Sequence, residues 1–299
     1  MRRKGTYYIG RVLKLGVLDQ AKLLVALKNP ATSYYRGNAW TFTDVEEHAN
    51  ETLHFVFGRL SKYTPEGEVA VVDTATKSEK RQIEPNLLVA SSPFIYIPEH
   101  SGIAFLQVTN HIEAHIFRRR FCDIIKKTHD NFFVDCDIEL ISDLKTFAAK
   151  VSSLDGIFQI SARISPPNPL FNPLWKPLED YLRKRNTDRM TIVEDANQAE
   201  TLKTQLPELI KNASELTGEE QLTHKGEIPV GDAAILMAAD GYGTGLIRGK
   251  KGEDIVTVKT SETAVNFLFE KIPNINDLYQ KVLDVLEKIK KSRHMEHGE

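Results

Sequence analysis

The alternation of apolar and polar residues is sharpest between residues 82 and 131. Two β-favouring runs, 86–97 and 102–109, flank a short connection at 98–101 and predict two strands. From residue 110, apolar side chains recur every three or four residues, which predicts one long amphipathic helix. Its stripe consists of Ile112, Ile116, Phe117, Phe121, Ile124 and Ile125. Asn110 and Glu113 have the spacing of a capping box, so the helix is expected to begin there.

Short β-favouring runs also dominate the chain before this stretch. We expect strands over 6–15, 40–42, 52–60 and 69–72, and a buried segment of either type over 23–27. Turn residues separate these runs at Arg36-Gly37-Asn38 and Pro65-Glu66-Gly67. The pattern predicts a β-rich N-terminal domain, residues 1–130, which ends with the hairpin and the basic helix.

The remaining residues, 131–299, predict a second domain in which strands and helices alternate. Its expected order is strand 132–141, helix 143–154 capped by Ser142, strands 156–165 and 190–194, helix 198–216 kinked at Pro207, and strand 233–239. This βαββαβ order is that of the ferredoxin-like fold. A hairpin over 244–260 and a helix from about 275 follow, and the apolar stripe of that helix indicates a core or a dimer interface. The predicted fold class is therefore α+β.

The proline-rich segment 165–175 separates the second and third of these strands. Its prolines exclude regular structure and hold the chain extended. A short helix is expected next, over 174–185.

Composition restricts the function. The chain of 299 residues has a net charge of −2, which excludes a protein that coats nucleic acid by bulk charge. No apolar run is long enough to cross a membrane, and the basic start Met1-Arg2-Arg3-Lys4 is not followed by the apolar segment of a signal peptide. The two cysteines fit neither a disulfide framework nor a zinc site. We expect a cytoplasmic protein with no membrane insertion.

Basic residues nevertheless gather in short clusters that could bind a phosphate backbone. The candidates are Arg118 and Arg119 on the helix, Arg183, Lys184 and Arg185 at the end of another helix, and Arg248, Lys250 and Lys251 in the last hairpin. Solvated helix faces, and cations that complement a helix dipole, are the alternative interpretations. Tyr34, Tyr35 and Trp40, beside Arg36, predict either a base-stacking platform or an ordinary packed sheet surface.

Acidic residues alternate along the strand expected over 132–141. The period of two puts Asp135, Asp137 and Glu139 on one face, where three carboxylates could hold Mg²⁺ for phosphoryl chemistry. A solvent-facing acidic strand is the alternative. His111 and His115 share one helix face at a metal-ligand spacing, but no third ligand follows at a fixed spacing.

Two glycine-rich segments, 240–245 and 248–252, follow the apolar run 233–239. They indicate either hairpin turns or a basic loop that contacts phosphate. No Walker pattern and no serine or cysteine nucleophile motif occurs. We predict no catalytic residue, no metal and no cofactor, and we favour a binding protein over an enzyme.

The order of these parts resembles small bacterial and prophage proteins of unknown-function families that accompany phage-defence genes, a group that includes the phage lambda Rex exclusion protein. The resemblance covers the β-rich half, the basic helix, Asn168-Pro169-Leu170, Asp240-Gly241-Tyr242-Gly243 and the C-terminal helix. It implies DNA binding with little sequence specificity, dimerisation, and a part in anti-phage defence or phage exclusion.

The functional expectation is thus a DNA-binding component of a bacterial anti-phage system, present as a homodimer or as a subunit of a defence complex. Two alternatives stay open. One is a metal-dependent nuclease that uses Asp135, Asp137 and Glu139, and the other is a structural subunit of a multiprotein complex.

Overall fold

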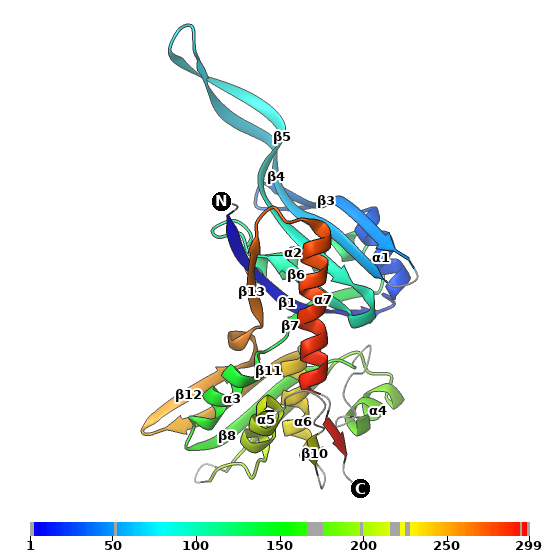
Figure 1. Cartoon of the computed structure of the whole chain (residues 1–299), viewed down its shortest axis with the longest axis vertical. Helices are drawn as coiled ribbons and strands as arrows, with labels where there is room; N and C mark the ends of the chain where they lie inside the picture. The colour runs from blue at the N-terminus through cyan, green and yellow to red at the C-terminus, as the bar shows by residue number, and fades with distance from the viewer. Residues whose placement is uncertain are drawn as a thin grey trace.

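The chain has a mixed α+β fold built on two antiparallel sheets (Figure 1). The computed structural model describes residues 3–50, 53–166, 176–197, 200–215, 222–224, 228–293 and 295–297. The larger sheet has the order β13 (Asn266–Glu270), β1 (Lys4–Gly16), β6 (Gly102–Leu106), β5 (Ser78–Ile97), β4 (His54–Asp73), β3 (Asn38–Ala49), β2 (Ser33–Tyr35). β7 (Val134–Leu140) pairs with the second half of β1. In addition, β10 (Leu222–His224) and β14 (Met295–His297) form a parallel pair.

Helices cover both faces of the larger sheet. α1 (Gln20–Lys28) and α2 (Ala114–Thr128) pack on one face, where the rings of Phe105 and Phe117 stack with their centroids 4.0 Å apart. α7 (Ile275–Ser292) packs on the opposite face, against alternate residues such as Ile95 and Ile97. The apolar stripe of α7, which includes Leu278 and Val282, is therefore part of the core of this chain.

The smaller sheet has helices on one face and exposed side chains on the other. Its order is β12 (Asp254–Lys259), β11 (Gly243–Lys251), β8 (Gly156–Ile164), β9 (Met190–Asp195). α3 (Leu144–Ser152), α5 (Leu206–Glu215) and α6 (Val230–Met237) contribute to one core with alternate residues of β8 and β11. Arg163, Val193 and Arg248 are exposed on the opposite face.

The strand predicted over 233–239 is wrong, because this run forms α6 and then the π-helical turn η3 (Ala238–Tyr242). An apolar run buried on all sides has no periodicity that separates helix from strand, and its four alanines favour the helix. β7 pairs with β1 in the larger sheet instead of joining β8. The ferredoxin-like arrangement is consequently not confirmed.

Several local predictions also need correction. Segment 23–27, which the sequence left open between helix and strand, is helical and lies in α1. Glu113, not Asn110, is the N-cap residue of α2, and Asn110 adopts a positive φ of 65°. Asp143 caps α3 in place of Ser142 by accepting a hydrogen bond from Thr146 N. Pro207 lies in the first turn of α5 and causes no kink there, since proline is compatible with a helix start.

The turn expected at Pro65-Glu66-Gly67 is wrong, because β4 continues through it to Asp73. β4 and β5 pair as far as Asp73 and Ser78, so the chain reverses at 74–77. Figure 1 shows the result, a long two-stranded arm that projects from the body of the molecule. We call residues 64–88 the arm.

Other expectations agree with the structure. The connection at 98–101, the stripe of α2, the two-residue turn at Arg36-Gly37 and the hairpin of β11 and β12 all form. Most of the proline-rich segment, 167–175, lies outside the described residues, and α4 (Lys176–Lys184) follows it. The division at residue 130 stays a prediction, although β7, β13 and α7 come from beyond it and pack with the larger sheet.

Candidate nucleic-acid interface

The three consecutive arginines of α2 have three different environments, because successive helical residues point about 100° apart. Arg118 points to β7, where its Nε donates to the Ile138 carbonyl at 2.5 Å and its Nη2 to Glu139 Oε2 at 2.8 Å. Arg120 is buried and pairs with Asp123 at 2.8 Å. Arg119 is exposed. Of the two arginines predicted on this helix, Arg119 is therefore the one that is accessible to a ligand.

Cations surround the two tyrosines of β2 and form a surface with α2. The guanidinium of Arg120 lies 3.9 Å from the centroid of the Tyr35 ring, and those of Arg36 and Arg119 lie at 5.2 and 5.9 Å. Lys127 Nζ lies 5.3 Å from the Tyr34 ring. These six residues, named the cation–aromatic cluster below, are Tyr34, Tyr35, Arg36, Arg119, Arg120 and Lys127. Tyr34 is 66% exposed, whereas Trp40, also predicted for the platform, is buried in the core.

A tight hairpin brings the tyrosines to the helix. Tyr35 pairs with Asn38 across the turn formed by Arg36 and Gly37, which have positive φ values of 48° and 74°. Such two-residue turns require φ above zero at both central positions, and glycine satisfies this requirement without strain. The short strand β2 then contacts α2 at the edge of the larger sheet.

The acidic face of β7 is neutralised by cations from three other parts of the fold. Lys126 lies 2.6 Å from Asp135, and Arg189 lies 3.3 Å from both Asp135 and Asp137. Arg163 of β8 lies 3.4 Å from Asp137 and 3.9 Å from Glu139. The alternative of a solvent-facing acidic strand therefore holds only in part, because Asp135 and Asp137 are partly exposed whereas Glu139 is buried. The network also joins the two sheets. Glu139 of the larger sheet contacts both Arg118 of α2 and Arg163 of the smaller sheet.

Two carboxyl groups of this network have shifted pKa values. Burial raises the pKa of Glu139 to about 7, against the lowering effect of Arg118. Burial also opposes ionisation of Asp135, but the hydrogen bonds from Lys126 and Cys136 N outweigh it and lower its pKa. Glu139 consequently changes charge near neutral pH, whereas Asp135 stays ionised.

This pairing argues against the nuclease alternative. The cations of Arg118, Lys126, Arg163 and Arg189 occupy the positions beside the carboxylates that a divalent ion would need. In the described ranges, no group of three His, Cys, Asp or Glu side chains could hold a metal ion. The expectation that His111 and His115 share one helix face is wrong, because His111 precedes α2 whereas His115 lies in its first turn; both side chains are exposed.

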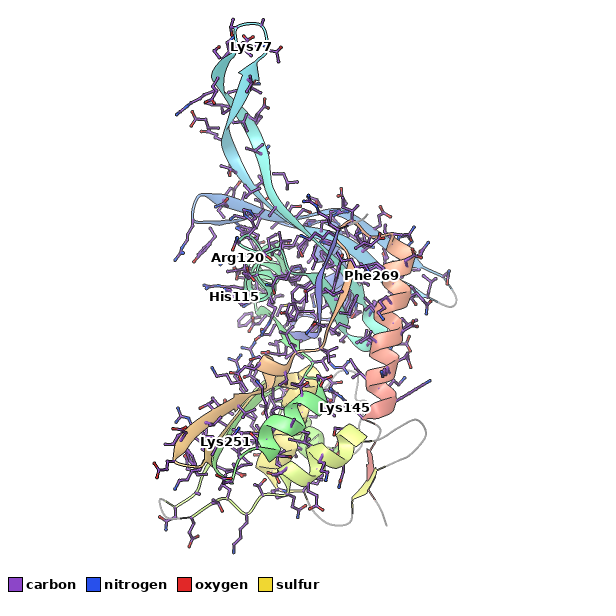
Figure 2. The ribbon with its side chains drawn as sticks, turned by 60° about the vertical axis from the view of Figure 1, so that its left-hand side comes forward. Lys77, His115, Arg120, Lys145, Lys251 and Phe269 are labelled. Atoms are coloured by element: carbon purple, nitrogen blue, oxygen red, sulfur yellow. The ribbon has the colours of Figure 1, made fainter. Side chains whose placement is uncertain are left out.

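The other predicted cations lie on different elements. Arg183 and Lys184 are exposed on the last turn of α4, and Arg185 follows them. Arg248 and Lys250 are exposed on the open face of β11, and Lys251 is exposed at its end. Figure 2 shows Arg120 and Lys251 on the same side of the molecule. Arg163 is on the open face of the same sheet as Arg248, so the network of β7 connects that face to α2.

The glycine-rich segment 240–245 is largely buried in the core. Gly241, Tyr242 and Gly243 are buried, and Gly241 needs its positive φ of 85°. Arg11 donates to the Asp240 carbonyl at 2.8 Å and lies 4.9 Å from the Tyr242 ring centroid. This segment is therefore not an accessible phosphate loop, and the interpretation as a hairpin turn is also wrong because η3 forms there.

Sequence reasoning missed Arg120 as a partner of Tyr35, and it missed Arg163 and Arg189 as partners of the acidic strand. Arg189 stands just before β9 and Arg163 near the end of β8, and nothing in their spacing indicates β7. These contacts depend on how the two sheets meet.

Comparison with known proteins places the chain in a family. No helix among the described residues has the length and apolar character needed to span a membrane. No curated protein matches the sequence. A family described as a domain of unknown function, DUF4747, matches residues 22–227, which is most of the chain, and the protein therefore belongs to the DUF4747 family.

Proposed function

We propose that this protein binds DNA, with little sequence specificity, through the cation–aromatic cluster. The observation that carries the proposal is the gathering of four cations around Tyr34 and Tyr35, from two elements that are distant in sequence. Guanidinium and ammonium groups neutralise phosphates, and an exposed aromatic ring stacks on a nucleobase. The cluster combines both kinds of contact on one surface.

The residues of the cation–aromatic cluster have different roles in this proposal. Arg36, Arg119 and Lys127 are exposed and contact phosphate, while the exposed ring of Tyr34 stacks on a base. Arg120 is buried between Tyr35 and Asp123 and positions the Tyr35 ring. Because the contacts are to the backbone and to ring faces, they carry little sequence information. A local surface of this kind also suits a chain with a net charge of −2.

Fluorescence anisotropy tests the proposal with a labelled single strand and its duplex, each at several salt concentrations. The test variant combines Arg119→Ala with Lys127→Ala. The control variant combines Lys145→Ala with Lys288→Ala, which removes the same charge from exposed sites on α3 and α7. We expect the test variant to bind more weakly and its log–log salt slope to fall by roughly 1.4 on the single strand or 1.8 on the duplex, from two lost phosphate contacts.

A test variant that folds normally and binds like the control would contradict the proposal. The same titration with Arg248→Ala plus Lys250→Ala would then show whether the open face of β11 is the DNA surface instead. Absence of binding by the parent at any salt concentration would favour the structural subunit.

The place of this DNA binding in anti-phage defence is part of the same proposal. It is supported by the resemblance of the order of parts to phage-exclusion proteins. Plaque counts on bacteria that express the parent or the Arg119→Ala, Lys127→Ala variant test it, with immunoblots to match expression. Protection by the parent, and its loss in the variant, is the expected result. Equal plaque counts with and without the parent would refute the defence role.

A further inference from the structure

The arm is the part of the fold whose side chains are least buried by the rest of the chain. β3 pairs with β4 only up to Tyr63, and β6 pairs with β5 only from Phe94 onward. Between these limits β4 and β5 pair with each other alone, among the described strands. The arm is about 30 Å long at roughly 3.3 Å per residue. Figure 2 places Lys77 at its far end.

Two properties of the arm indicate that it binds another protein chain. Val72, Ile83 and Leu88 are 66, 71 and 59% exposed, although β-branched and leucine side chains stabilise a sheet by being covered. The two outer edges also present unpaired backbone groups, and an isolated two-stranded ribbon is only marginally stable in water. A further strand along one edge would supply both the hydrogen bonds and the cover.

The charges on the two outer strands indicate which edge of the arm, β4 or β5, pairs with a second copy of the chain. The outer part of β4, residues 64–73, has three acidic residues and no basic residue. Two of these acids pair within the arm with cations of β5, Asp73 with Lys80 at 2.5 Å and Glu68 with Arg81 at 3.3 Å. The β4 strand itself therefore has no positive charge to offer to a second copy of β4. The outer part of β5, residues 78–88, has two acidic and two basic residues, which are Glu79, Lys80, Arg81 and Glu84. The β5 edge is therefore the one at which a second copy of the same strand meets charges of both signs.

The order of these charges is self-complementary. When two β5 edges run antiparallel about a two-fold axis at Gln82, Lys80 of each copy lies opposite Glu84 of the other copy. Lys80 also pairs with Asp73 of its own arm, so the cation lies between two carboxylates. Opposite charges facing each other across strands are stabilising, and a two-fold axis repeats the pair. Pro85 has no N–H to donate and limits the paired segment to about 80–84.

We infer that two copies of this chain form a dimer by pairing their arms along the β5 edges, with Gln82 on the two-fold axis. The four strands of the two arms then form one continuous ribbon. The alternative dimer surface suggested by the stripe of α7 is used inside the chain, since Leu278, Val282 and Leu286 are buried there. The arm carries none of the residues of the cation–aromatic cluster, so the dimer and the DNA binding can be tested separately.

Sedimentation velocity of the full chain over a wide range of concentration tests the inference. Glu84→Lys places like charges opposite each other twice and should weaken the dimer by roughly ten- to a hundredfold. Lys80→Glu combined with Glu84→Lys restores opposite charges between the copies. Asp73→Asn is added to this variant, because Lys80→Glu would otherwise face the Asp73 carboxylate of its own arm, and the dimer should be restored. Glu66→Lys is the matched control, because it makes the same change on β4 and should leave the dimer intact.

Cross-linking through cysteine tests directly whether Gln82 lies on the two-fold axis of the dimer. Gln82→Cys should form a disulfide between two copies under mild oxidation, whereas Lys77→Cys at the tip should not. Both native cysteines are buried and do not interfere. A parent that is monomeric at every concentration would overturn the inference. So would a dimer that is unaffected by Glu84→Lys and fails to cross-link through position 82.

Discussion

Arg118 of α2 binds Glu139 of β7 at 2.8 Å, and this carboxyl is only 3% exposed. The arginine that the sequence offers as a DNA contact therefore holds a buried acid at the junction of the two sheets. Arg163 approaches the same carboxyl from β8. This relationship separates the structural arginine of α2 from its neighbour Arg119, and two predictions depend on it.

Stability should fall as the pH rises from about 5 to 8. Folded Glu139 keeps its proton up to about pH 7, while an unfolded glutamate loses it near pH 4.3. Between these values the folded chain binds more protons, so raising the pH favours unfolding, by roughly 2 to 4 kcal/mol from this group. Urea unfolding of the parent and of Glu139→Gln at several pH values across this range measures this change in the free energy of unfolding. The variant should lack this loss, and parallel curves for the two proteins would contradict the assignment.

Arg118→Ala should lower the stability of the fold, whereas Arg119→Ala should weaken DNA binding. Loss of Arg118 leaves Glu139 without its nearest cation and should lower the free energy of unfolding by roughly 1 to 3 kcal/mol, more above pH 7, where the carboxyl is ionised. Loss of Arg119 should change it by less than about 0.5 kcal/mol and weaken DNA binding instead. Urea unfolding and anisotropy of both variants provide the comparison. Equal stability of the two variants would show that Arg118 is not structural.

Asp240→Ala should be among the most damaging single substitutions. Asp240 accepts a hydrogen bond from the buried guanidinium of Arg293, which also donates to the carbonyls of Ala239 and Ser142 and so fixes the end of α7 to η3. Removal of the carboxylate leaves a buried charge uncompensated, at a cost of roughly 3 to 5 kcal/mol. Asp254→Ala, at an exposed position of β12, is the control. Similar urea midpoints for the two variants would refute this role.

The two cysteine thiols should react slowly in the folded protein. Cys122 and Cys136 lie 3.3 Å apart, Sγ to Sγ, and are 6 and 3% exposed. Burial raises the pKa of the Cys122 thiol, so little of the reactive thiolate forms near neutral pH. Reaction with Ellman's reagent should therefore need local or global unfolding and should accelerate steeply in urea. Lys77→Cys, at the exposed tip of the arm, supplies an accessible thiol as the positive control, and equal rates for all three thiols would contradict the prediction.

The sequence by itself determined the elements whose periodicity is strong. The stripe of Phe117, Phe121 and Ile124 predicted α2, and the stripe of Leu278 and Val282 predicted α7, because one buried face imposes a period near 3.6. Alternation likewise predicted β7 and the face shared by Asp135, Asp137 and Glu139. The clusters of basic residues were also evident in the sequence.

Tertiary structure decided what periodicity does not encode. The run 233–239 is buried on all sides, so its apolar residues fit a strand as well as the helix that forms. The arm extends past Pro65 and Gly67 because β5 pairs with β4 there, which overrides the local turn preference. The packing of α2 against β2 and β7 placed Arg118 against Glu139 and Arg119 in the cation–aromatic cluster. These contacts join residues far apart in the chain, and local propensity carries no information about which partner a side chain will meet.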